Sequence, residues 1–352
     1  MIRRIIIINF LIITVLASLP ASETKDGLIR LLLNERNGSF SFHYLANSQT
    51  EDYESLLSYH KSVTSYLTVN VNGRSYQLGK SRAFNVKAGN TNGNQEIIYE
   101  SGLLLIKQVI TPVKTSNSPN VNGIMITINI ENKSHEETAV GLRILIDTYL
   151  GEGRGRIPFI TDNLDITAET IIKSDSGDSY WISRRDGLSL MGNIKNPFNK
   201  DSKQPDYLHF ANWKKLNDVP WKAPYSPGRL FNSVPYSIGD SAVCYYYEPD
   251  ILSGGASFNY TIYLTAEDTQ WYTATQTAAE NSNIEAPAAN IAAAAAEENS
   301  IEEASPNNKD SDILTLIKLN EIITQFLAGD ILLNEQDLLE IEMSISRFNR
   351  NR

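Results

Sequence analysis

The chain has 352 residues, of which 41% are hydrophobic and 20% charged, so it carries enough apolar material for a globular core. Its 31 basic residues are outnumbered by 41 acidic ones, which gives a net charge of −10 and disfavours a nucleic-acid partner. A single cysteine, Cys244, excludes an internal disulfide and a cysteine-rich zinc site.

The first 22 residues have the pattern of a secretory signal peptide. Arg3 and Arg4 precede an apolar stretch over residues 5–19, and small residues follow at Ala21 and Ser22. This stretch is shorter than the roughly 20 apolar residues that a membrane-spanning helix needs. No cysteine follows it, so we do not expect a lipoprotein. We expect residues 1–22 to be cleaved and the protein to be exported, to the periplasm or the cell surface.

Short apolar or β-branched runs separated by turn residues fill the next 250 residues or so. They predict about a dozen strands, more than a seven-stranded immunoglobulin-type domain holds, and therefore a large two-sheet antiparallel β-sandwich in residues 23–272. The predicted strands are 28–33, 39–44, 65–71, 75–78, 96–99, 102–112, 121–131, 138–149, 166–172, 188–192, 242–247 and 258–265.

Two of these strands have especially clear patterns. Isoleucines occupy alternate positions from Ile124 to Ile130, which places them on one face of a half-buried strand. The run from Tyr66 to Val71 is followed by Asn72-Gly73, a pair that favours the positive φ angles of a type I′ turn. We therefore expect a β-hairpin at this point.

The C-terminal quarter has a different composition. Residues 273–311 are rich in Ala, Glu and Asn without an amphipathic stripe, which is typical of a linker. Residues 312–352 predict two antiparallel helices, one beginning at Asp312 and the other at Asn334. The first helix is apolar around more than one face, so we expect the pair to dock on an envelope protein or a second copy, with the protein's own sandwich as the third alternative. The residues expected to dock are Ile317, Ile323, Phe326, Leu338 and Ile345.

A family resemblance rests on short motifs that occur in a consistent order. Residues 138–160 contain Gly-Leu-Arg, Asp-Thr, Gly and Pro-Phe, and further pieces occur at residues 64–66 and 211–213. The sequence resembles an uncharacterised family of exported bacterial β-sandwich proteins over residues 36–265, which leaves the helical tail outside. After Gly151 the chain reads Glu-Gly-Arg-Gly-Arg, where the family pattern leads us to expect an Asn-Asp-Gly-like stretch. The resemblance implies an architecture and no established catalytic chemistry.

Arg143, Leu145 and Asp147 share one face of a predicted strand. One interpretation is structural: a buried ion pair, or a carboxylate that caps the following turn. The alternative makes Asp147 a sugar-binding or acid–base carboxylate in a cleft, with Asp206 as the second carboxylate.

Aromatic residues cluster between Tyr180 and Tyr247, and within this stretch we expect the proline-rich residues 193–240 to be a long loop. Tyr207, Trp213 and Trp221 are candidate ligand-binding residues together with Arg143, because aromatic faces beside polar groups suit sugar rings. The other interpretation is that this loop folds over an open sheet face and its aromatic residues form a small core of their own.

The four histidines are isolated, and the Ser-x-x-Lys match at Ser58 and Lys61 lacks the other elements of a penicillin-recognising site. We therefore expect no metal, no cofactor and no catalytic residues. The favoured function is therefore a non-enzymatic exported β-sandwich that binds or scaffolds an envelope partner. The alternative is a carbohydrate-binding or carbohydrate-active protein, mutarotase-like in architecture, that uses Asp147, Asp206 and the loop aromatic residues.

Overall fold

The computed structural model describes residues 21–57, 64–148, 150–153, 155–196, 199, 201–236, 239–267 and 269. Within them the protein is mainly β, with nineteen strands in antiparallel sheets and one short helix, which confirms the predicted fold class. None of these residues belongs to a helix long and apolar enough to cross a membrane. The expected linker 273–311 and the helical hairpin 312–352, with its docking residues, lie outside the described residues.

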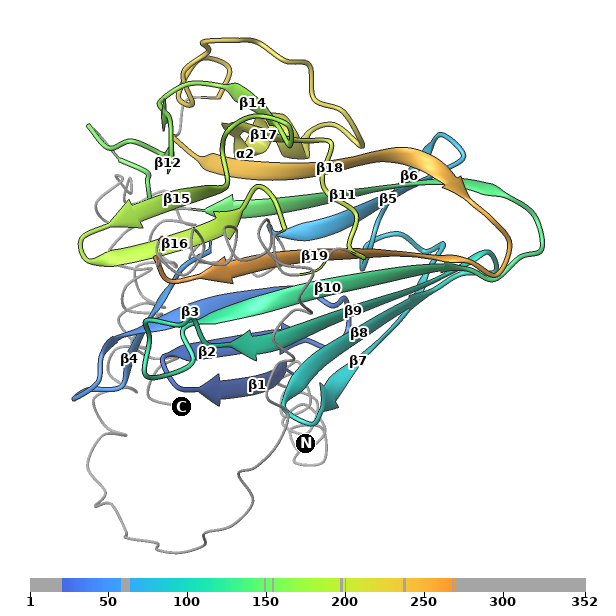
Figure 1. The fold of residues 1–352 in the computed structure, drawn as a ribbon, viewed down its shortest axis with the longest axis horizontal. Helices are drawn as coiled ribbons and strands as arrows, with labels where there is room; N and C mark the ends of the chain where they lie inside the picture. Colours follow the sequence, from blue (N-terminus) through green and yellow to red (C-terminus); the bar gives the residue numbers. More distant parts are fainter. Residues whose placement is uncertain are drawn as a thin grey trace, which may run out of the picture. The chain divides into compact units, whose positions relative to one another are not determined.

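The largest sheet has nine strands (Figure 1). In spatial order they are β13 (Asp165–Ile166), β12 (Phe159–Thr161), β15 (Tyr180–Arg185), β16 (Leu188–Asn193), β19 (Ser257–Thr265), β10 (Gly123–Asn132), β9 (Leu104–Val113), β8 (Asn94–Glu100) and β7 (Asn85–Thr91).

The second sheet has six strands. Their spatial order is β14 (Thr170–Lys173), β17 (Tyr207–Asn212), β18 (Ser241–Leu252), β11 (Thr138–Thr148), β5 (Tyr66–Val71) and β6 (Arg74–Gln77). The helix α2 (Trp213–Asn217) follows β17 directly. Asn212 begins this helix as an N-cap, because its side chain accepts hydrogen bonds from the backbone of Lys214 and Lys215.

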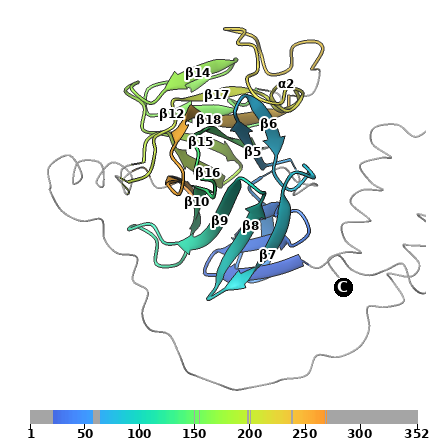
Figure 2. The same ribbon diagram turned by 90° about the vertical axis from the view of Figure 1, so that its right-hand side faces the viewer.

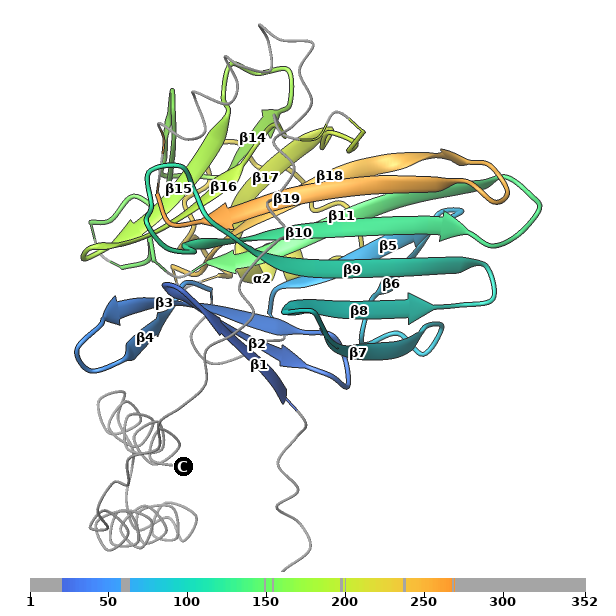
Figure 3. The ribbon, with the colours of Figure 1, turned by 60° about the horizontal axis from the view of Figure 1, so that its bottom comes forward.

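A small third sheet has the order β1 (Ala21–Asp26), β2 (Ile29–Asn34), β3 (Phe40–Asn47) and β4 (Asp52–Ser55) (Figure 3). Gln95 of β8 joins it to the largest sheet by donating a 2.7 Å hydrogen bond to Thr24. Strand β1 begins at Ala21, inside the segment 1–22 that we expected to be a signal peptide, and residues 1–20 are outside the described residues.

The core lies between the two large sheets, which Figure 2 shows layered with β17 and β18 above β16 and β10. The isoleucines from Ile124 to Ile130 in β10 are at most 1% exposed, as their alternation predicted. Val140, Leu142 and Ile144 of β11 face them from the six-stranded sheet and are at most 2% exposed. Alternation along β11 therefore sends Arg143, Leu145 and Asp147 to the opposite face of that sheet.

Three hairpins turn on an Asn-Gly or Asp-Gly pair with two positive φ angles. The predicted turn at Asn72-Gly73 has φ values of 49° and 82°. Asn92-Gly93, with 53° and 80°, joins β7 to β8, and Asp186-Gly187, with 43° and 87°, joins β15 to β16. Strands β7 and β15 were not predicted, although their turns carry the same hairpin signal.

Part of the segment 193–240 is wrongly predicted as loop, because it contains β17 and α2. In β17, Leu208 and Phe210 enter the core while His209 lies on the other face, so the strand does alternate. The buried His209 hides this pattern in the sequence. The predicted strand 166–172 is in fact two short strands, β13 and β14, that belong to different sheets.

Residues 213–226, which we call the outer layer, cover the outward face of the six-stranded sheet. They form a second, smaller core with that face, centred on Tyr246. Tyr207 stacks on Tyr246 with ring centroids 4.7 Å apart, and Trp221 meets it edge-on at 6.1 Å. The arrangement matches the second interpretation of the aromatic loop, in which these side chains pack together.

One close contact in the larger core gives a direct test of the packing. Trp181, 0% exposed, lies over Gly192 so tightly that a Cβ atom there would come within 2.4 Å of the indole ring. We expect Gly192→Ala to lower the free energy of unfolding by about 1–3 kcal/mol in chemical denaturation. Gly89→Ala is the matched control, because a Cβ there meets nothing within 4 Å. Equal losses in the two variants would contradict the predicted overlap.

Candidate active site

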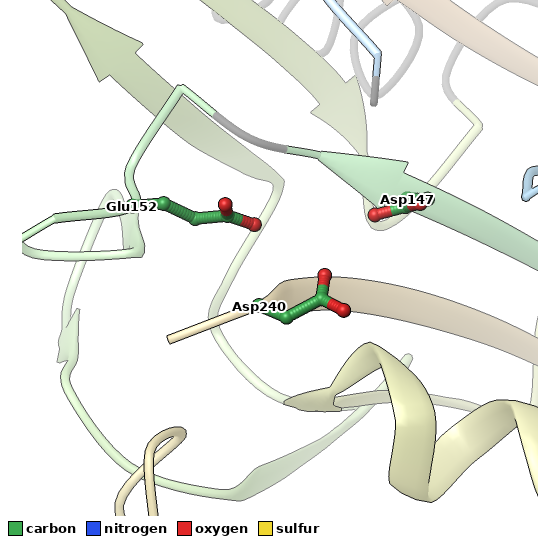
Figure 4. Close-up of side chains that lie close together, drawn as sticks. All are labelled: Asp147, Glu152 and Asp240. Carbon is green, nitrogen blue, oxygen red and sulfur yellow. The ribbon is translucent and has the colours of Figure 1, made fainter. Parts of the chain in front are cut away.

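Three carboxyl groups meet where β11 ends and β18 begins (Figure 4). Asp147 is the last residue but one of β11, Glu152 lies in the loop that follows, and Asp240 immediately precedes β18. The antiparallel register pairs Thr148 with Ser241, so it brings these three segments together. One oxygen of each carboxyl group lies within 4.8 Å of the others.

The loop after β11 holds Glu152 in this position. Gly151 passes so close to Pro158 that a Cβ would lie 2.2 Å from the Pro158 carbonyl oxygen, and its N–H donates to Ser183 Oγ at 2.9 Å. The Ser241 N–H then donates to Glu152 Oε1 at 2.8 Å. A glycine is therefore required for the turn that aims Glu152 at β18.

Neighbouring segments fix the other two acids. Asp147 is 2% exposed, and its N–H donates to Ser65 Oγ at 3.0 Å. The Trp213 N–H donates to the Asp240 carbonyl oxygen at 3.1 Å. The cluster is thus built from the six-stranded sheet, the residue before β5 and the start of α2.

The environment separates the pKa values of two of these groups. Burial raises the pKa of Glu152 to about 8; the hydrogen bond from Ser241 opposes this rise, while the charges of Asp240 and Asp147 add to it. Burial raises the pKa of Asp240 to about 6. At pH 7 Glu152 is therefore mainly protonated and Asp240 mainly ionised, so an acid stands beside a base.

Glu152 also lines an open polar cleft of about 710 Å³. The other lining residues are Glu54, Gly153, Arg156, Arg185, Asp186 and Leu188. Arg185 pairs with Glu54 at 3.1 Å and Arg156 with Asp186 at 2.8 Å. The cleft thus places hydrogen-bond donors and acceptors beside Glu152, as a hydroxyl-rich ligand requires.

The same three carboxyl groups are a possible cation site. Carboxylate oxygens are the ligands that Ca²⁺ and Mg²⁺ prefer, and the sequence analysis did not expect such a group. A bound cation would favour the ionised forms, so cation binding and a protonated Glu152 oppose each other.

The structure separates the two carboxylates that the alternative interpretation paired. Asp206 is exposed, and its Oδ2 accepts a 2.7 Å hydrogen bond from the Glu248 N–H. Asp147 pairs with Ala242, which lies six residues before Glu248 on β18, or about 20 Å along the strand. The neighbours of Asp147 in the cluster are Glu152 and Asp240, not Asp206.

Arg143 is 1% exposed and serves the outer layer. It donates to the carbonyl oxygens of Leu216 and, at 3.3 Å, of Val219, and to Cys244 Sγ at 3.1 Å. The ion pair with Asp147 that the sequence suggested does not form. The Trp213 indole likewise donates to the Thr64 carbonyl at 3.0 Å, so both candidate ligand-binding residues hold the covering segment in place.

A second group of buried ionisable residues lies under the outer layer. Lys215 donates to both oxygens of Glu169 at 2.7 and 2.6 Å, and His209 Nε2 lies 2.9 Å from Glu169 Oε1. The Ser226 N–H donates to the same carboxylate at 2.9 Å. Burial lowers the pKa of His209, which favours the neutral imidazole. Glu169 is thus fully engaged, and the network joins the outer layer to β17.

The raised pKa of Glu152 makes a prediction about stability. The folded state binds more protons than the unfolded state between the ordinary value of 4.5 and about 8, so this group lowers stability as pH rises through that window. We compare the free energy of unfolding of Glu152→Gln with that of the native protein. The difference in favour of the variant should be about 2–4 kcal/mol larger at pH 8.5 than at pH 4. Urea unfolding of both proteins across this range measures it, and a difference that stays constant would contradict the shift.

No family model and no curated protein matches the sequence. Solved structures do match. A galactose mutarotase related enzyme from Lactobacillus acidophilus is 11% identical with a TM-score of 0.44, and the match covers 71% of this chain and 98% of that one. A galactose mutarotase-like protein from Lactobacillus casei is 11% identical with a TM-score of 0.40, and the match covers 70% of this chain and 100% of that one. A polysaccharide lyase is 10% identical with a TM-score of 0.40, and the match covers 71% of this chain and 34% of that one.

The carboxyl cluster corrects the predicted function. We expected a non-enzymatic scaffold, but the described residues hold a carboxylic acid beside a carboxylate, an arrangement typical of catalytic sites. The scaffold prediction is therefore wrong.

Proposed function

We propose that the protein is an enzyme that opens and recloses the ring of a free sugar by proton transfer, with Asp240 as the base and Glu152 as the acid. One observation carries this proposal: the two carboxyl groups lie within 4.8 Å of each other, and their pKa values, about 6 and about 8, fall on either side of neutral pH. Proton transfer by two such groups is most effective near pH 7.

The chemistry needs no group beyond these two. The Asp240 carboxylate takes the proton of the hydroxyl on the anomeric carbon, and the electron pair of that O–H bond forms the C=O bond as the bond to the ring oxygen breaks. The Glu152 carboxylic acid gives its proton to the ring oxygen. Rotation of the freed aldehyde and the reverse steps yield the other anomer and restore both carboxyl groups.

The closeness of the acids suits this reaction. The two oxygens that exchange protons are bonded to one carbon, so the acid and the base must stand side by side. In this scheme the buried Asp147 is a positioning residue, because its charge helps to keep Glu152 protonated.

Anomer interconversion tests the proposal directly. Freshly dissolved α-anomers of common hexoses and pentoses are followed by polarimetry or ¹H NMR with and without the protein. We expect a bell-shaped pH profile for kcat/KM with limbs near pH 6 and pH 8. Absence of acceleration for every sugar, or activity that requires Ca²⁺ and disappears with EDTA, would refute the assigned roles.

A further inference from the structure

A cavity of about 430 Å³ lies where the three sheets and α2 meet. Aliphatic walls come from Ile126, Ile144 and Ile146, and aromatic walls from Phe40, Tyr99 and Trp213. The volume is within the range of about 300–1,000 Å³ that is usual for small-molecule sites. None of the three acids of the carboxyl cluster lines this cavity, although Ser65 and Trp213, which hold the backbones of Asp147 and Asp240, do.

One polar side chain interrupts the apolar wall. In β9 the inward positions are Leu104, Ile106, Gln108 and Ile110, so Gln108 occupies a position where the alternation calls for an apolar residue. Its side chain is 1% exposed and lines the cavity. Tyr99 donates to Gln108 Oε1 at 3.4 Å, and burial raises the Tyr99 pKa, which keeps this phenol protonated.

The side-chain hydrogen bond that Gln108 makes to the described residues goes through Oε1, so its amide N–H groups are left for a partner in the cavity. A ligand oxygen at this point would therefore be favoured. Among the residues that line the cavity, Lys80 alone carries a formal charge, and its side chain is exposed. The inner cavity is therefore suited to a neutral ligand.

We propose that this cavity binds a small neutral aromatic alcohol, whose ring packs against the aromatic and aliphatic walls and whose oxygen accepts a hydrogen bond from Gln108. The aromatic side chains favour edge-to-face contact with a planar ring, and the single amide donor selects for one oxygen. This binding site is independent of the proposed sugar chemistry, so either proposal can fail without the other.

Two matched probes, 2-naphthol and naphthalene, test the site in the full chain. We expect saturable binding of 2-naphthol, seen as a change in tryptophan fluorescence and a rise in Tm, and about tenfold weaker binding of naphthalene, which lacks the oxygen. In Gln108→Leu the two affinities should become equal. The comparison of the two probes on the unmodified protein decides the question even where that variant does not fold.

A second pair of variants tests the location. Ile126→Phe should fill the cavity and abolish binding of both probes, whereas Ile128→Phe, on the same strand and equally buried but outside the cavity, should retain both affinities. No saturable 2-naphthol binding up to about 1 mM, equal affinity for both probes in the unmodified protein, or unchanged binding in Ile126→Phe would each overturn the proposal.

Discussion

Asp240→Asn will lower the rate of sugar ring opening by about 10²–10⁴-fold, because the amide keeps the shape of the side chain and cannot take the proton. The residue lies beside Glu152 at the start of β18, and its backbone is held by Trp213, so the substitution should leave the fold intact. Anomer interconversion at pH 7 measures the loss, and the melting temperature reports on folding.

Asp206→Asn is the matched control, since that carboxylate is exposed and accepts a hydrogen bond from Glu248, far along β18 from Asp240. We expect it to keep the native rate within about twofold. A folded Asp240→Asn protein with the native rate would reject Asp240 as the base. A similar loss in both variants would place the chemistry elsewhere.

Lys215→Met will lower the free energy of unfolding by about 3–5 kcal/mol, the largest stability effect that we expect from one substitution. Lys215 is 6% exposed and gives two hydrogen bonds to Glu169, which is 3% exposed. Without the ammonium group the carboxylate is left buried with an uncompensated charge. Chemical denaturation at pH 7 measures the loss.

The adjacent Lys214 provides the control. It pairs with Asp218 at 2.7 Å on the exposed side of α2, and such surface pairs contribute about 0–1 kcal/mol, so Lys214→Met should change little. The double variant Lys215→Met with Glu169→Gln should recover part of the loss, because it removes the stranded charge. If Lys214→Met and Lys215→Met cost the same, the buried pair is not what anchors the outer layer.

Local patterns in the sequence predicted the local structure well. The alternating isoleucines of β10 and the Asn72-Gly73 hairpin both follow from rules that act within a few residues. Strand β17 was not predicted because the buried His209 lies at its centre, and a local pattern cannot show that Glu169 supplies the partner. That partner lies 40 residues away along the chain.

The candidate site was even harder to predict from local sequence patterns. Asp147 was a candidate because it ends a conspicuous strand, but its true neighbours depend on the pairing of Thr148 with Ser241, which are 93 residues apart. No local sequence pattern predicts that register. Glu152 and Asp240 were missed for this reason, although Gly151 beside Glu152 marked a sharp turn.

Strand β19 has a consequence for how the chain folds. It lies between β16 and β10, so it joins a half-sheet that contains β15 and β16 to another that contains β7 to β10. Its partners in β10 are more than 120 residues earlier in sequence, a high contact order that predicts folding on the slow side, in milliseconds to seconds. Until residues 257–265 are available, β10 and β16 each present an open edge that can pair with other chains. A nascent chain that stops short of β19 should therefore be markedly more prone to aggregation than one that includes it.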